Sequence, residues 1–165
     1  MLKKKTFAPF PTNFLPTFQN QRSNTIWSPT NLSFFDRKTD ARNFLLNFSK
    51  NKPFYLQLKT LDLGETSLDD NSLKEVIEHL ITNQELPLIS LDLSGNNFSD
   101  TGAQLLCKAL ANNTRMTDCN LKGNTEIYDN TLDAIKLILE RNKNPQNSMT
   151  DISVQHPTIP CCVQS

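Results

Sequence analysis

The sequence has few of the features that mark enzymes, nucleic-acid binders and membrane proteins. Among 165 residues there are 4 glycines, 2 histidines and 1 tryptophan, and 17 basic side chains equal 17 acidic ones in number. A chain without net charge is not expected to bind nucleic acid. No run of about 18 apolar residues is present, which excludes a transmembrane helix. Prolines interrupt the segment after Lys3, Lys4 and Lys5, which argues against a signal peptide and predicts a cytoplasmic protein.

Motifs for catalysis and metal binding are also missing. There is no G-x-S-x-G, no H-E-x-x-H and no P-loop, and His79 falls in a helical pattern where we expect it to be exposed. Cys107 and Cys119 occupy positions of an apolar pattern and are predicted to be core residues. Cys161 and Cys162 are adjacent rather than spaced like zinc ligands. We therefore predict a protein that is not an enzyme, has no catalytic residues and binds no metal or cofactor.

The strongest positive signal is an internal repeat within residues 54–142. The pattern L-x-x-L-x-L occurs at three places: residues 58–63, 88–93 and 116–121. Met116 and Cys119 replace two of the leucines in the third copy. Leucines at alternate positions predict strands with one buried face. An apolar pattern of helical spacing follows each copy, so the sequence predicts three units of a strand and a helix.

The predicted helices begin at polar residues that suit helix N-termini. Asp70, Asp100 and Asp129 precede the three helical patterns and are predicted to be N-caps, because their side chains can accept bonds from free helix amides. An earlier helix is predicted to start at Thr39 or Asp40.

The repeat resembles the leucine-rich repeats of the ribonuclease-inhibitor-like type, which have a strand and a helix in about 28 residues. Leu88, Leu91, Leu93 and Asn96 match the core L-x-x-L-x-L-x-x-N, whereas Thr66 replaces the asparagine of the first copy. The resemblance implies an α/β fold, namely a short right-handed solenoid of about three repeats. Its parallel sheet would form the concave face and its helices the outer one.

Asn96 and Asn124 are predicted to turn inward from the loops that follow their strands. A buried amide is tolerated only where hydrogen bonds satisfy it. We expect both side chains to bond the backbone of the strand-to-helix loops.

Composition divides the chain into four parts. Residues 1–38 form a head rich in Phe and Pro that is predicted to be extended or disordered. Residues 39–53 are predicted to be a capping helix, residues 54–142 the repeats, and residues 143–165 a mobile tail. The head carries six basic side chains and one acidic one, for which ordinary variation in a solvated flank is the simplest interpretation.

The strand positions between the buried leucines point to the concave face, which is the candidate binding surface. A protein partner of unknown identity is predicted there, although a solvated sheet face must be polar in any case. Asp62 and Asp92 favour a basic partner. A tropomodulin-like actin regulator is one variant of this hypothesis, and no motif selects it. The candidate partner-binding residues are Thr60, Asp62, Ser90, Asp92, Asp118, Asn120 and Lys122.

The segment from Cys162 to Ser165 supports an alternative function. It resembles a C-a-a-X prenylation box, and Cys161 beside it could add a second acyl anchor. Gln164 departs from this motif, and a chance cysteine is the simpler interpretation. Together with the composition, which is reminiscent of effectors of intracellular bacteria, this predicts a lipid-anchored effector that is secreted into a host and tethered to its membrane. A membrane partner is expected only if Cys162 is lipidated.

Overall fold

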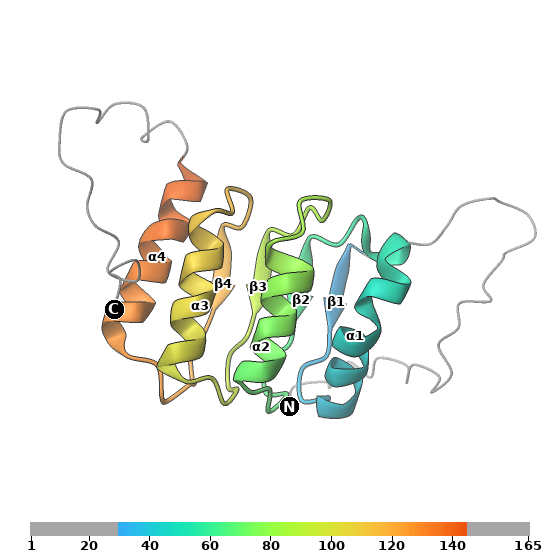
Figure 1. Ribbon diagram of the computed structural model, residues 1–165, viewed down its shortest axis with the longest axis horizontal. Coiled ribbons are helices and arrows are strands. Elements are labelled where there is room, and N and C mark those ends of the chain that lie inside the picture. The colour runs from blue at the N-terminus through green and yellow to red at the C-terminus, as the bar shows by residue number, and fades with distance from the viewer. Residues whose placement is uncertain (1–29, 145–165) are drawn as a thin grey trace, which may run out of the picture.

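The computed structural model describes residues 30–144, which form an α/β fold with four parallel strands and four helices. The strands pair in the order β1-β2-β3-β4, and one helix follows each strand (Figure 1). The strands are β1 (Asn31–Ser33), β2 (Thr60–Asp62), β3 (Ser90–Asp92) and β4 (Asp118–Asn120). The helices are α1 (Lys38–Asn51), α2 (Asp70–Val76), α3 (Asp100–Ala111) and α4 (Asp129–Lys143).

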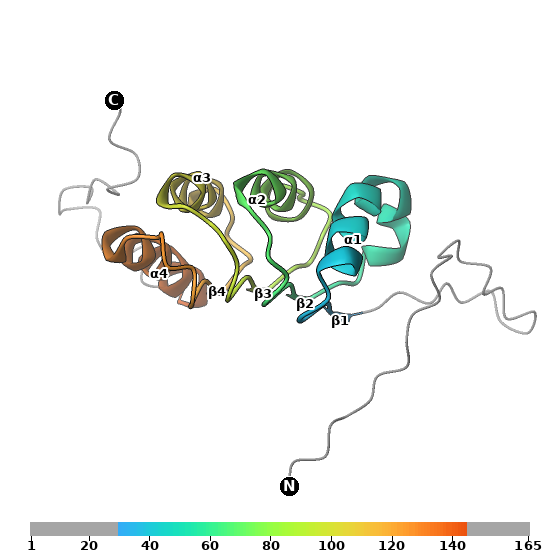
Figure 2. The same ribbon diagram turned by 90° about the horizontal axis from the view of Figure 1, so that it is seen from below.

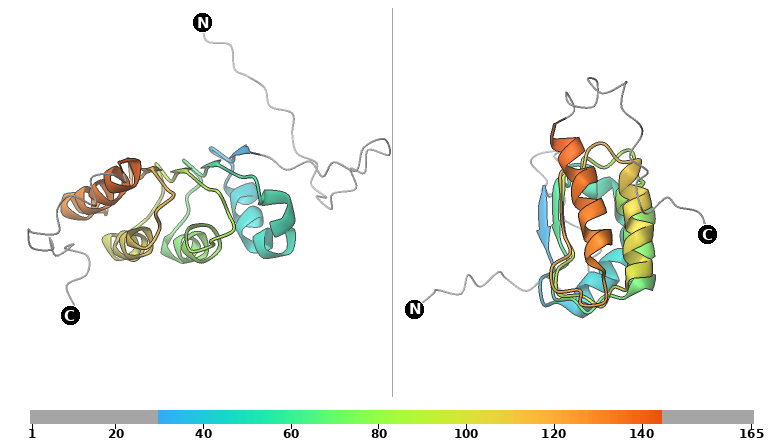
Figure 3. Two further views of the ribbon diagram at one scale, coloured as in Figure 1. Left: turned by 90° about the horizontal axis from the view of Figure 1, so that it is seen from above. Right: turned by 90° about the vertical axis from the view of Figure 1, so that its left-hand side faces the viewer.

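All four helices lie on the same side of the sheet. Figures 2 and 3 show α1, α2 and α3 in one layer on one side of the strands, while α4 lies closer to β4 at the end of the sheet. No element within residues 30–144 covers the opposite side. We call this opposite side the open face.

The core lies between the sheet and the helix layer. Leu61, Leu63, Leu91 and Leu93 are at most 2% exposed, as their alternate spacing predicted. Helix residues close the core from the other side: Ala41, Leu45, Leu73, Val76, Ala103, Leu106, Ile135 and Ile138.

A fourth strand–helix unit precedes the three that the repeat predicted. Leu32 of β1 is in register with Leu61 of β2, and Phe34 is half-buried at the next inward position. Residues 31–33, which fall in the head that was predicted to be extended or disordered, form strand β1, and α1 is the helix of this first unit. A pattern match to leucine missed the unit because phenylalanine stands where the later copies have leucine. Residues 1–29 and 145–165 lie outside the described part.

The N-caps of the helices lie one to three residues earlier than predicted. The N-cap of α2 is Asp69, whose Oδ1 accepts a bond from the Ser72 amide at 3.0 Å. The N-cap of α3 is Ser99, whose Oγ accepts from the Gly102 amide at 3.3 Å. Tyr128 precedes α4 and Arg37 precedes α1, and neither side chain caps its helix. The predicted N-caps Thr39, Asp40, Asp70, Asp100 and Asp129 all lie inside the helices.

Asp70 and Asp100 instead connect one unit to the next. Asp70 Oδ1 accepts a hydrogen bond from the Ser99 amide at 2.9 Å, and Asp100 Oδ1 accepts one from the Tyr128 amide at 3.1 Å. The carboxylates therefore satisfy amides at the entrance of the following helix, rather than those of their own helix. Asp129 is in the last described unit and has no following helix there.

The buried asparagines behave as predicted. Asn96 Nδ2 donates to the carbonyls of Leu63 at 2.9 Å and Leu93 at 3.0 Å, and its Oδ1 accepts from the Leu68 amide at 2.9 Å. Asn124 Nδ2 bonds the Leu93 carbonyl at 3.0 Å in the same way. Each amide group therefore ties its own loop to that of the preceding unit.

The spacing of the first two repeats has a local cause. They are offset by 30 residues rather than 28. The helix that begins with α2 continues as the π-helical turn η2 (Ile77–Ile81). The helix of this unit therefore ends at residue 81 and is as long as α3, 12 residues. The two extra residues of the longer repeat lie between the helix and the next strand, in residues 82–89 against residues 112–117 of the following unit.

Two chemically active side chains lie differently from their predictions. His79 is half-buried rather than exposed, and its ring stacks on Phe48 with centroids 6.1 Å apart. Cys107 is buried as predicted, whereas Cys119 is only half-buried. Burial first, and then the charges of Asp118 and Asp92, raise the pKa of Cys119 to about 12.

Replacing Asn96 by alanine is expected to lower the free energy of unfolding by about 1–3 kcal/mol, because backbone groups of two loops lose their buried partner. Urea denaturation measures the change. The neighbouring Asn97 is exposed and provides the matched control, since Asn97→Ala removes the same side chain at the surface. Equal losses for the two variants would contradict the role given to Asn96.

Gly102→Ala is expected to destabilise the protein by about 1–3 kcal/mol through overpacking. A Cβ at Gly102 would lie 2.3 Å from Asp70 Oδ1, so the carboxylate must leave Ser99. In a protein that also carries Asp70→Ala, Gly102→Ala should lower the free energy of unfolding by much less. A double-mutant cycle in thermal or urea unfolding tests this coupling, and additive effects of the two changes would refute it.

Candidate interaction face

Alternate residues of the strands place polar side chains in rows across the open face. The first row contains Asn31, Thr60, Ser90 and Asp118, and the second contains Ser33, Asp62, Asp92 and Asn120. The backbone pairing continues past the strands, since the Glu65 amide bonds the Ser94 carbonyl at 2.9 Å. A third row therefore follows: Phe35, Gly64, Ser94 and Lys122. All seven predicted binding residues belong to these three rows.

Side chains of neighbouring strands bond one another within the rows. In the first row Ser90 Oγ donates to Asp118 Oδ2 at 2.8 Å. In the second row Asn120 Nδ2 donates to Asp92 Oδ2 at 3.0 Å, and Ser33 Oγ donates to Asp62 Oδ2 at 2.7 Å. These bonds fix the orientation of the polar groups before any partner is present.

The second row also has a structural role that the sequence did not reveal. Oδ1 of Asp62 accepts from the Gly64 amide at 3.0 Å, and Oδ1 of Asp92 accepts from the Ser94 amide at 2.8 Å. Asn120 Oδ1 accepts from the amide two residues later in the same way, at 3.2 Å. Such bonds to a backbone amide two residues on are typical of Asx turns. The three side chains therefore hold the loops that leave the strands.

The side chains of the remaining predicted residues do not hold the loops that leave the strands. Asp118 and Lys122 are exposed at the β4 end of the face, and Thr60 and Ser90 are half-buried in its middle. Substitutions at Ser90, Asp118 or Lys122 are therefore better suited to probing binding than substitutions in the second row.

Phe35 contributes the aromatic side chain of the third row and was not among the residues predicted for the binding face. Its side chain is 53% exposed. A methyl group placed on Gly64 would lie 3.1 Å from Phe35 Cδ2 and 3.3 Å from Asp62 Oδ1, so ring and carboxylate flank the same backbone position. The alignment of Phe35 with Gly64 and Ser94 follows from the register of the first unit, which the repeat pattern did not include.

Like charges face each other in the second row. The register pairs Asp62 with Asp92, and adjacent strands lie only about 4.8 Å apart. Burial raises the pKa of Asp92, but hydrogen bonds from Ser94 and Asn120 outweigh this effect and hold it below its ordinary value. None of the ion pairs found within residues 30–144 involves a carboxylate of the open face: they are Arg37–Asp40, Lys52–Glu85 and Lys143–Glu140.

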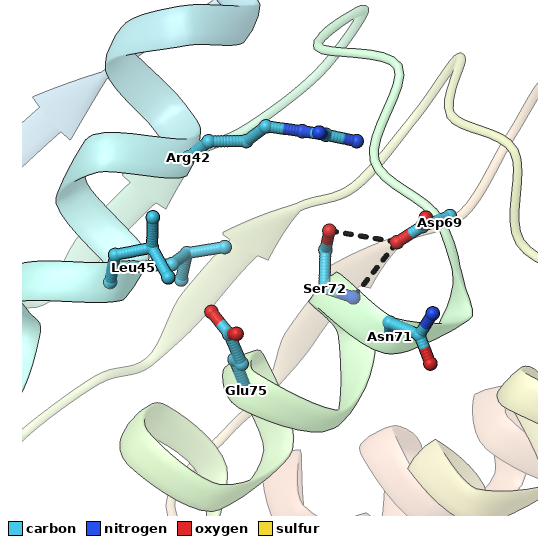
Figure 4. Close-up of a pocket in the computed structure, with 7 residues that line it drawn as sticks. Arg42, Leu45, Asp69, Asn71, Ser72 and Glu75 are labelled. Carbon is cyan, nitrogen blue, oxygen red and sulfur yellow. Dashed lines mark hydrogen bonds between the residues drawn. The ribbon is translucent and has the colours of Figure 1, made fainter.

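A shallow pocket of about 190 Å³ lies elsewhere, between α1 and α2. Figure 4 shows Arg42 of α1 above Ser72 and Glu75 of α2. Hydrogen bonds from the Ser72 amide and hydroxyl hold the pKa of Asp69 below its ordinary value. The Asp69 carboxylate is thus engaged in capping α2, and the other charged or amide side chains that line the pocket are those of Arg42, Asn71 and Glu75. The open face is the stronger candidate site.

Residues 30–144 contain no group of three or more His, Cys, Asp or Glu side chains arranged to hold a metal ion. None of the described helices is long and apolar enough to span a membrane. Cys161 and Cys162 lie outside the described residues, so their lipidation stays a prediction.

Comparison with known proteins identifies a fold but no family. No protein-family model matches the chain, and neither does any curated protein. Among solved structures it is similar to leiomodin-1 actin-binding site 2, with 18% identity and a TM-score of 0.53. The match covers 72% of this chain and 83% of that one. At this identity the likeness shows a shared fold alone, which is compatible with a repeat α/β fold.

Asp92 is expected to make stability depend on acid pH. Its pKa is lower in the folded protein than the ordinary value of about 3.9 for an unfolded chain. The stability that its charge contributes is therefore present above about pH 4 and is lost as the pH falls through the folded pKa. Asp92→Asn should be less stable than the wild type at pH 7, and the difference should shrink towards pH 3 in urea unfolding. A difference that stays constant with pH would contradict this account.

Proposed function

We propose that the protein is a non-enzymatic protein-interaction module, and that its units form a short leucine-rich-repeat solenoid with the open face as its concave, partner-binding side. The observation that carries this proposal is a rigid polar sheet face that no element within residues 30–144 covers. Its side chains are already oriented by bonds between strands, so little side-chain entropy is lost when a partner binds.

The solved neighbour supports a protein partner in general terms. That neighbour is an actin-binding site of leiomodin-1, and this chain shares its fold. Fold likeness does not carry a partner from one protein to another. Actin is therefore one purified protein to test, and the partner is otherwise defined only as a protein.

Second-row substitutions would be ambiguous tests, because Asp62, Asp92 and Asn120 also hold loops. Ser90 and Asp118 lie in the first row, where their side chains bond each other and no loop amide. A bulky cation at position 118 should block a partner by size and charge while leaving the buried core unchanged.

Photo-crosslinking tests the proposal. A benzoylphenylalanine placed at Ser90 should crosslink a protein in cell extract, and Asp118→Arg should remove that product without changing the thermal unfolding of the chain. The matched control carries the same crosslinker at Lys136, which is exposed on α4, and should not give the product. Crosslinks that arise equally from both positions, or that survive Asp118→Arg, would overturn the assignment of the open face. The same crosslinking experiment is repeated with purified actin in place of the cell extract.

A further inference from the structure

The β1–β2 corner of the open face combines an exposed ring with a fixed carboxylate. Phe35 is 53% exposed, and both its Cδ2 and Asp62 Oδ1 approach the outward side of Gly64. Gly64 itself is buried, and a Cβ there would also lie 3.1 Å from Ser94 Oγ, so a cation would reach this corner over the exposed part of the Phe35 ring rather than through the space above the glycine. An aromatic ring beside a carboxylate attracts a cation, because ring quadrupole and negative charge act in the same direction.

The carboxylates at this corner keep acceptor capacity that the protein does not use. Asp62 accepts from Ser33 and Gly64, whereas an ionised carboxylate offers about four lone-pair sites. Asp92 is beside Asp62 in the parallel register of β2 and β3, so two carboxylates border this corner. None of the ion pairs within residues 30–144 reaches the row, so a cation of a partner would supply the opposite charge.

The third row ends differently at β4. Lys122 lies beyond Asn120 of β4 and is exposed, and Asp118 is exposed in the first row of the same strand. The ammonium group of Lys122 disfavours a second cation in the third row. The third row therefore has a direction, with the exposed ring of Phe35 at one end and the ammonium group of Lys122 at the other.

We propose that the open face binds an extended, arginine- or lysine-bearing segment of a partner protein, with one cationic side chain held between Phe35, Asp62 and Asp92. This inference rests on the proposed function, because it assigns ligand chemistry to the same face. The cation stacks on the ring and donates hydrogen bonds to the carboxylate oxygens, while the segment backbone lies over the small and polar side chains of the rows.

Fluorescence anisotropy with the full chain tests the proposal. The probe is a short labelled peptide of alternating arginine and serine, and its matched control contains citrulline in place of arginine. Only the arginine peptide should bind, and more weakly as salt rises. Phe35→Ala and Asp62→Asn should each weaken binding about three-fold or more, whereas Lys122→Ala should strengthen it. Asp62→Asn keeps one acceptor oxygen for the Gly64 amide, so it removes the charge rather than the turn, while the Ser33 hydroxyl loses its acceptor oxygen.

The controls separate this site from general attraction to an acidic surface. Asp133 is exposed on α4, and Asp133→Asn removes the same charge away from the face, so it should leave binding unchanged. An equal effect of Asp62→Asn and Asp133→Asn, or no effect of Phe35→Ala, would overturn the proposal. If the peptide binds only after Lys3, Lys4 and Lys5 are replaced by serine, the chain's own basic residues occupy the face and the assignment to a partner is wrong.

A failure of the basic-ligand proposal can be distinguished from a failure of the proposed function. Specific crosslinks from Ser90 together with no selective arginine-peptide binding would refute the basic ligand and keep the interaction face. Selective peptide binding that Phe35→Ala and Asp62→Asn weaken, and that Lys122→Ala strengthens, supports both.

Discussion

The architecture depends on satisfying backbone groups in the loops that leave each strand. These loops turn from the sheet towards the helices inside a dry core, where an unpaired carbonyl or amide is costly. The side chain of Asn96 meets this requirement with donors to two carbonyls and an acceptor for one amide, and Asn124 repeats the solution one unit later. Because each amide group bonds two units at once, the same interaction that closes a loop also fixes the spacing between neighbours.

The helix entrances add a second connection between units. Asp70 and Asp100 accept backbone amides of the following unit, and the absence of a Cβ at Gly102 leaves the room that Asp70 needs. Loops on one side and helix entrances on the other therefore hold adjacent units in register. No unit could bury its apolar face alone, so stability in such a stack comes from the interfaces between neighbours.

The same polar side chains of the open face hold loops of the fold and are available to the proposed partner. Asp62, Asp92 and Asn120 each use one oxygen to hold a loop, and the parallel register then brings two of these carboxylates together. The acidic character of the face is thus a by-product of a turn that needs an acceptor side chain. The third row nevertheless has a direction, from Phe35 beside β1 to Lys122 beyond β4.

The sequence by itself determined the α/β fold, the inward leucines and the buried roles of Asn96 and Asn124, because these follow from a local pattern that recurs at a nearly fixed period. It also placed all seven candidate residues on one face, since alternation along a strand is a property of the backbone. Tertiary structure decided the rest. Leu32 and Phe34 belong to a first unit that the leucine spacing did not show. Asp70 and Asp100 accept hydrogen bonds at the start of the next helix instead of their own. Tertiary structure also placed Phe35 beside Asp62. These outcomes depend on which neighbouring backbone lies within hydrogen-bond or packing distance, and a sequence pattern read one unit at a time does not contain that information.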